Sequence, residues 1–194
     1  TLVALSYKYP TCNVFHGRRS QLYANKEEKD PEWPEFLSFN NFMLKENKSH
    51  SITEFLYRTS AIAGTGYVVF PLGWCSDNAS LIRFIQTGGV VSSRNVLAFF
   101  RHSEEHISRK GEKEFIKVKA LMQYWAFLLN LHDNPVPIQE RKESFNYLLM
   151  SSFYSAVFLD QIKMLFYVPL YFWPLKVRCA LLLDLLFHKK YELN

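Results

Sequence analysis

The apolar side chains of the last fifty residues are not confined to one helical face. From Ser144 to Phe187, large apolar residues recur on every side of the helices that this segment would form. A helix that is apolar all round lies in a protein core or in lipid, whereas a helix at a soluble surface keeps a polar face. The segment therefore predicts helices that need either a large core or an apolar neighbour.

Upstream of this segment, residues 112–131 show the clearest amphipathic period. Their large apolar residues recur at three- and four-residue steps, at Phe115, Val118, Met122, Trp125 and Leu129. Pro135 and Pro137 cannot continue a helix, and a second helix is expected from Ile138 to at least Leu159. The short connection predicts an antiparallel helical hairpin. Pro169 then breaks the chain, and Pro174 suits the first position of a last helix.

The middle of the chain predicts shorter helices. Ser51 and Glu54 have the spacing of a capping box for a helix to about Thr59. A second helix is expected from Asn78 or Ser80 to Gln86, and a third from Ser92 or Ser93 through the charged residues 101–109. The uncharged segment 59–76 has about the minimum length of a membrane span; a buried strand or loop is the alternative.

Residues 1–50 lack a regular period, because Pro10 and Gly17 interrupt it. Trp33, between Pro31 and Pro34, predicts an extended segment with an aromatic anchor. The sequence thus predicts a mainly α fold, a bundle of helical hairpins with an extended N-terminal arm. The arm is assigned to residues 1–50 and the helical domain to residues 51–194.

Composition narrows the function classes only a little. Aromatic residues make up 16% of the 194 residues and only 7 residues are Gly. This composition favours helices that pack against one another through large side chains. The net charge of +5 permits an anionic partner without requiring one. The three cysteines are far apart and form no CxxC pair, which excludes a zinc knuckle and argues against a disulfide scaffold. The first residue is Thr rather than Met, which is compatible with a removed organellar presequence and with other origins.

Residues 101–106 are the densest cluster of candidate chemistry. His102 and His106 would share a helical face, with Glu105 beside them, in the HxxEH order of inverted zinc peptidases. In that interpretation the two histidines bind a metal and Glu105 is the base. A third ligand is required, and no second motif supplies one.

Arg101 and His106 also form an R-x4-H pair. This pair resembles the motif of HEPN-type ribonucleases, which are helical and independent of metal. The resemblance implies that Arg101 stabilises the phosphate and that His106 is a general acid or base; His102 stands where those enzymes usually carry Asn. The third interpretation, which we favour, is a solvated helix end with Glu105 and Arg109 paired four residues apart. The remaining histidines, His16 among them, are interpreted as surface or capping residues.

The C-terminal helices also suggest a contact surface. The uncharged stretches 144–159 and 164–175 are too short for a full span, but their flanks combine aromatic and basic residues as membrane interfaces do. The predicted membrane or partner contacts are Trp33, Phe153, Tyr167, Tyr171, Trp173, Lys176 and Arg178. A large soluble helical core remains the alternative.

We therefore hypothesise a non-catalytic accessory subunit of a membrane-associated complex, in a mitochondrion or another organelle. Its partners would be other protein subunits and membrane lipid, without nucleic acid and without a cofactor. The alternative hypothesis is the metal-independent endoribonuclease that uses Arg101 and His106.

Overall fold

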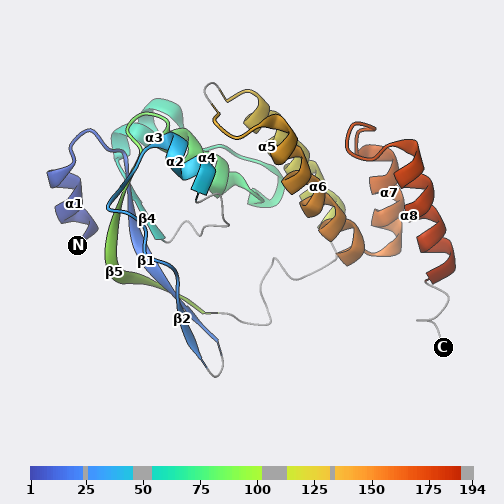
Figure 1. Cartoon of the computed structure of the whole chain (residues 1–194), viewed down its shortest axis with the longest axis horizontal. Coiled ribbons are helices and arrows are strands. Elements are labelled where there is room, and N and C mark those ends of the chain that lie inside the picture. The colour runs from blue at the N-terminus through green and yellow to red at the C-terminus, as the bar shows by residue number, and fades with distance from the viewer. Residues whose placement is uncertain (24–25, 46–53, 102–112, 132–133, 189–194) are drawn as a thin grey trace.

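The computed structural model describes residues 1–23, 26–45, 54–101, 113–131 and 134–188. A mixed β-sheet with the helices of the first half of the chain forms one end, and the helices of the second half form the other (Figure 1). Helices account for 56% of the described residues and strands for 18%, so the fold has α/β character. The prediction of a mainly α, all-helical bundle was wrong, because it missed pairings between strands that are distant in the sequence.

The sheet is built around its first strand. Its strands are β1 (Val14–Leu22), β2 (Glu27–Lys29), β3 (Phe36–Leu37), β4 (Phe55–Tyr57) and β5 (Val90–Arg101). Strand β4 pairs antiparallel with the first part of β1. Strand β2 pairs antiparallel with the last part of β1. Strand β5 runs parallel to β1 along its whole length, and β3 pairs antiparallel with the start of β5. The parallel pair requires a crossover connection, which contains α2 (Phe39–Lys45), α3 (Thr59–Thr65) and α4 (Ser76–Ile85).

The N-terminal region is not an extended arm. Besides β1 to β3 it contains α1 (Leu2–Lys8) and α2 (Phe39–Lys45), and β1 is the strand that holds the sheet together. Gly17, Arg18 and Arg19 hide this strand in the sequence, because they replace the usual alternation of apolar and polar residues. The charges of Arg18 and Arg19 are balanced by carboxylates elsewhere in the chain.

Two predicted helices of the middle region are strands where the structure describes them. Phe55–Tyr57 is β4, and the predicted helix from Ser92 belongs to β5 as far as Arg101. The rest of both predicted helices, residues 51–53 and 102–109, lies outside the described residues. The register shifts twice between β1 and β5, beside Arg18, so β5 has extra residues that bulge from the ladder.

The helical predictions for the later part of the chain are largely confirmed. The remaining helices are α3 (Thr59–Thr65), the 3₁₀ turn η2 (Pro71–Gly73), α4 (Ser76–Ile85), α5 (Glu114–Leu129), α6 (Ile138–Ser155), α7 (Phe158–Tyr167) and α8 (Leu175–His188). Helices α5 and α6 form the predicted hairpin, and an interruption at Ala156 separates α6 from α7. Among the described residues, no helix has the length and apolar character needed to cross a membrane.

One continuous core connects the two ends of the molecule. It extends from Val90 in the sheet through Trp125 in α5 to Trp173, which is fully buried before α8. A small second cluster on the other face of the sheet joins Cys12, Phe15 and Val91 beneath α1. The core thus holds the C-terminal helices in place along one side only, and their other sides face outward.

Candidate functional site

The outer sides of α6, α7 and α8 carry the largest concentration of exposed apolar side chains. More than half of the large apolar residues that are exposed in the described chain lie between residues 138 and 183: Ile138, Tyr147, Leu148, Tyr154, Val157, Phe158, Leu159, Phe166, Tyr167, Leu170, Tyr171, Leu175, Leu182 and Leu183. We call this set the C-terminal apolar surface. Soluble monomers rarely expose large contiguous apolar patches, and such patches mark interaction sites.

The turn between α7 and α8, residues 168–174, is held in one conformation from inside. Arg178 donates hydrogen bonds to the carbonyl oxygens of Leu165, Val168 and Trp173. The indole Nε1 of Trp173 donates to Oδ1 of Asn146 in α6, at 3.1 Å. The bond to Leu165 satisfies a carbonyl group that α7 leaves unpaired at its C-terminus. Together these bonds fix the turn, which lies at the top of α7 and α8 in Figure 1.

The predicted contact residues divide into a buried and an exposed group. Trp33, Phe153 and Trp173 are buried and pack against this chain's own core. Arg178 is half-buried and is used inside the turn, as described above. Tyr167, Tyr171 and Lys176 are exposed, and for them the contact with membrane or partner stays a prediction.

Of the predicted catalytic and metal-binding residues, the structure describes only Arg101. Arg101 is the last residue of strand β5, where it pairs in register with Leu22, and not part of a helix as the resemblance to HEPN ribonucleases requires. His102 and His106 lie outside the described residues. Within the described ranges, no three His, Cys, Asp or Glu side chains are grouped so that they could hold a metal ion.

A buried polar network on β1 was not predicted. His16 is 3% exposed, and its Nε2 lies 3.6 Å from Oε2 of Glu54, which is also buried. The other carboxylate oxygen of Glu54 accepts a 2.7 Å hydrogen bond from Arg19, which also pairs with Asp30. The interpretation of His16 as a surface or capping residue was therefore wrong. The only local hint was its position between the apolar Val14-Phe15 pair and Gly17.

This network contains the residue types of an acid–base site, a histidine and a carboxylate, but a substrate could not reach them. The indole ring of Trp33 covers His16, with the ring centroids 3.8 Å apart, and Phe55 lies beside it. Nδ1 of His16 is buried and has no hydrogen-bond partner among the described residues. A general base must reach its substrate within hydrogen-bond distance, so we interpret the network as a structural element of the sheet.

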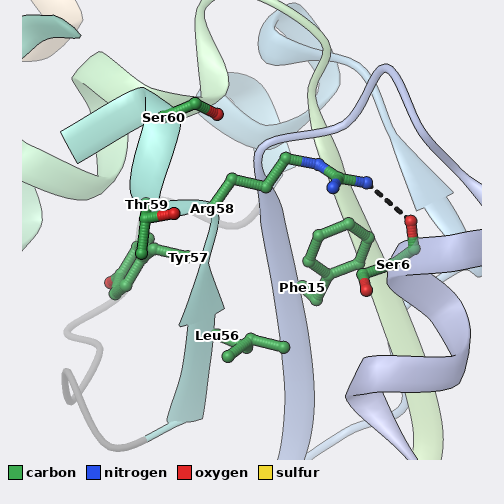
Figure 2. A pocket seen from close by; sticks show the side chains of 7 residues that line it. All are labelled: Ser6, Phe15, Leu56, Tyr57, Arg58, Thr59 and Ser60. Atoms are coloured by element: carbon green, nitrogen blue, oxygen red, sulfur yellow. Dashed lines mark hydrogen bonds between the residues drawn. The ribbon is translucent and has the colours of Figure 1, made fainter. Parts of the chain in front are cut away.

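A hollow of about 260 Å³ lies between α1, β4 and the start of α3 (Figure 2). Among the described residues that line it, the one cation is Arg58. Its guanidinium donates to the carbonyl oxygens of Ser6, Tyr9 and Cys12 and lies over the ring of Phe15. These bonds commit the guanidinium to the carbonyl groups around the end of α1. The hollow thus offers no uncommitted charged group to a ligand.

No family model, no curated protein and no solved structure matches this chain. Its function is therefore argued from the arrangement of its own residues, and among the described residues the C-terminal apolar surface is the feature that its own core does not explain.

Proposed function

We propose that this chain is a non-catalytic accessory subunit of a membrane-associated assembly, attached through the C-terminal apolar surface. The observation that supports the proposal is the exposure of this surface on three successive helices. Phe166 is 82% exposed and Leu175 is 70% exposed, although both belong to helices whose inner sides are well packed. Burying a side chain of this size, relative to leaving it exposed, would contribute roughly 1.5–3 kcal/mol of free energy.

The distribution of polar groups supports attachment rather than catalysis. Among the described residues, the polar network around His16 and Glu54 is closed by Trp33, and the hollow at Arg58 has its guanidinium bonded to backbone carbonyls. The apolar surface, in contrast, is carried by α6, α7 and α8, and Figure 1 shows α7 and α8 at the end of the molecule away from the sheet. An attached subunit of this shape would present its sheet away from the surface to which it binds.

The oligomeric state of the purified full chain tests the proposal. Without detergent we expect the chain to self-associate, because self-association removes this apolar surface from water, which is favourable. The variant Tyr154→Ser/Leu159→Ser removes two exposed side chains from α6 and α7 and should shift the chain toward monomer in analytical ultracentrifugation.

The matched control is Val69→Ser, at a residue that is as exposed but lies outside the C-terminal helices. It should leave self-association unchanged. A wild-type chain that is monomeric and monodisperse without detergent would contradict the proposal.

A further inference from the structure

The turn between α7 and α8 differs from the rest of the apolar surface in its chemistry. Its exposed residues, with those that flank it, are almost all apolar or aromatic: Phe166, Tyr167, Pro169, Leu170, Tyr171, Pro174, Leu175 and Lys176. We call these eight residues the tip. The two prolines lack backbone N–H groups, which leaves fewer polar groups to hydrate at this place.

Cations surround the tip. Lys142 of α6 places its Nζ 3.7 Å from the ring centroid of Tyr171, and Lys119 of α5 lies 6.0 Å from that of Tyr167. Lys176 belongs to the tip and is exposed. A long lysine side chain can lie along an apolar surface and keep its ammonium group in a polar layer.

Carboxylates are scarce on the same part of the chain. Between Ala156 and Leu183 the sequence contains a single acidic residue, Asp160. Asp160 is buried and bonded to Lys163 and to the backbone N–H of Phe115. Glu143, one residue after Lys142, accepts a hydrogen bond from Gln139. The tip therefore combines apolar and aromatic groups with the exposed charge of Lys176 and the half-buried charges of Lys142 and Lys119. This is the combination that membrane interfaces favour.

We infer that the tip inserts into the headgroup layer of a bilayer that contains anionic phospholipid, with Leu170 and Leu175 at the acyl boundary and Lys142 and Lys176 at the phosphates. Attachment is from one side and does not require a spanning helix. The fixed conformation of the turn, held by Arg178, means that little ordering is needed on binding. This inference rests on the proposed function and names the occupant of the tip.

Flotation of the purified full chain with lipid vesicles tests the inference. We expect binding to vesicles of phosphatidylcholine with phosphatidylserine to be about tenfold or more tighter than binding to phosphatidylcholine alone, since each lysine near an anionic surface favours binding. Added salt should reduce this preference. Leu170→Glu/Leu175→Glu should abolish flotation with both vesicles. Lys142→Gln/Lys176→Gln should remove the preference for phosphatidylserine and retain the weak binding to phosphatidylcholine.

The control is Val69→Glu, which adds a carboxylate at an exposed apolar residue outside the tip and should float as the wild type does. Circular dichroism should show the same helix content for all variants. The inference is overturned if the wild type floats with neither vesicle, or if the tip variant floats unchanged. If the wild type fails to float but self-associates through Tyr154 and Leu159, the lipid inference fails alone; if it does neither, the proposed function fails with it.

Discussion

The indole ring of Trp33 stacks on the imidazole of His16, with 3.8 Å between the ring centroids and 21° between the planes. Trp33 stands in the segment between Pro31 and Pro34, and His16 is in β1. The prolines keep this segment extended, so that it crosses the sheet and closes the His16–Glu54 pair from solvent. The aromatic anchor expected from the sequence therefore exists, and it anchors the segment to the chain's own sheet.

This relationship predicts a large effect of removing the ring. Trp33→Ala should lower the free energy of unfolding by about 3–5 kcal/mol, because it leaves a cavity and admits water to the buried contact between His16 and Glu54. Urea denaturation followed by circular dichroism measures the change. Trp33→Phe, which keeps a stacked ring, should cost clearly less. Equal losses for the two variants would contradict the role that we assign to the ring.

A second prediction concerns the close approach of Gly17 to Leu97. A Cβ atom added at Gly17 would lie 2.9 Å from Cβ of Leu97, because Leu97 is one of the extra residues of β5 and has no register partner on β1. Gly17→Ala should therefore destabilise the protein by about 1–3 kcal/mol, as overpacking does.

The second residue of the pair supplies the check on this explanation. Leu97→Gly removes the opposing Cβ, so Gly17→Ala should cost less in that background than in the wild type, which a double-mutant cycle of urea midpoints measures. Gly64→Ala is the matched control, because nothing lies within 4 Å of its added Cβ. It should be neutral or stabilise helix α3 slightly. Additive effects of Gly17→Ala and Leu97→Gly would exclude the contact as the cause.

The two parts of the fold differ in how far their sequence predicts them. Helix α5 was predicted because its apolar period is local and is read within sixteen residues. Strand β1 was missed because Arg18 and Arg19 occupy its interior. Their carboxylate partners, Glu32 for Arg18 and both Asp30 and Glu54 for Arg19, lie 11 to 35 residues away. A charge that is balanced from a distance cannot be recognised as buried from its neighbours.

The local sequence pattern of strand β5 is also insufficient to predict its structure. Val96, Leu97, Phe99 and Phe100 fit a helical face as well as a strand, and the strand forms because nine of its residues pair with β1. The signal that favoured a strand was Val90-Val91 directly after the Gly88-Gly89 turn, since β-branched residues that follow a glycine turn are typical of strands. The exposed surface of α6 to α8 was easier to predict, because excess apolar content does not depend on topology.

The buried ion pair of α5 gives a third prediction. Nζ of Lys117 donates to Oε1 of Glu114 and lies 4.9 Å from the ring centroid of Trp74, and both side chains are almost completely buried. Lys117→Met should cost about 3–5 kcal/mol of unfolding free energy, because it leaves the carboxylate of Glu114 buried without this partner.

The double variant Glu114→Met/Lys117→Met distinguishes a lost partner from lost packing. Apolar residues of similar volume can replace a buried pair with little cost, so the double variant should be more stable than Lys117→Met in urea denaturation. Lys26→Ala, at an exposed pair with Glu28, should have no measurable effect. A double variant that is less stable than the single one would show that the charges themselves are required.

The fourth prediction concerns alkaline pH. Burial raises the pKa of the Cys75 thiol to about 12 and raises the pKa values of the Tyr57 and Tyr124 hydroxyls well above their ordinary range. The unfolded chain loses these protons from about pH 8.5 to 10, while the folded chain retains them. Because the unfolded state then binds fewer protons, the free energy of unfolding should fall as pH rises through this window, by up to about 1.4 kcal/mol per pH unit for each group. Urea midpoints at pH 7, 9 and 10.5 measure the loss.

Two matched variants locate the source of this alkaline loss. Tyr124→Phe removes a buried hydroxyl that would otherwise resist ionisation, so the stability of this variant should fall less steeply between pH 9 and 10.5 than that of the wild type. Tyr147→Phe removes a hydroxyl from a residue that is 74% exposed, and its pH dependence should match the wild type. The reason for the expected effect of Tyr124→Phe is that burial raises the pKa of Tyr124 in the folded state only, which gives this group a contribution to the slope. If both variants show the wild-type slope, burial of Tyr124 is not a cause of the alkaline instability.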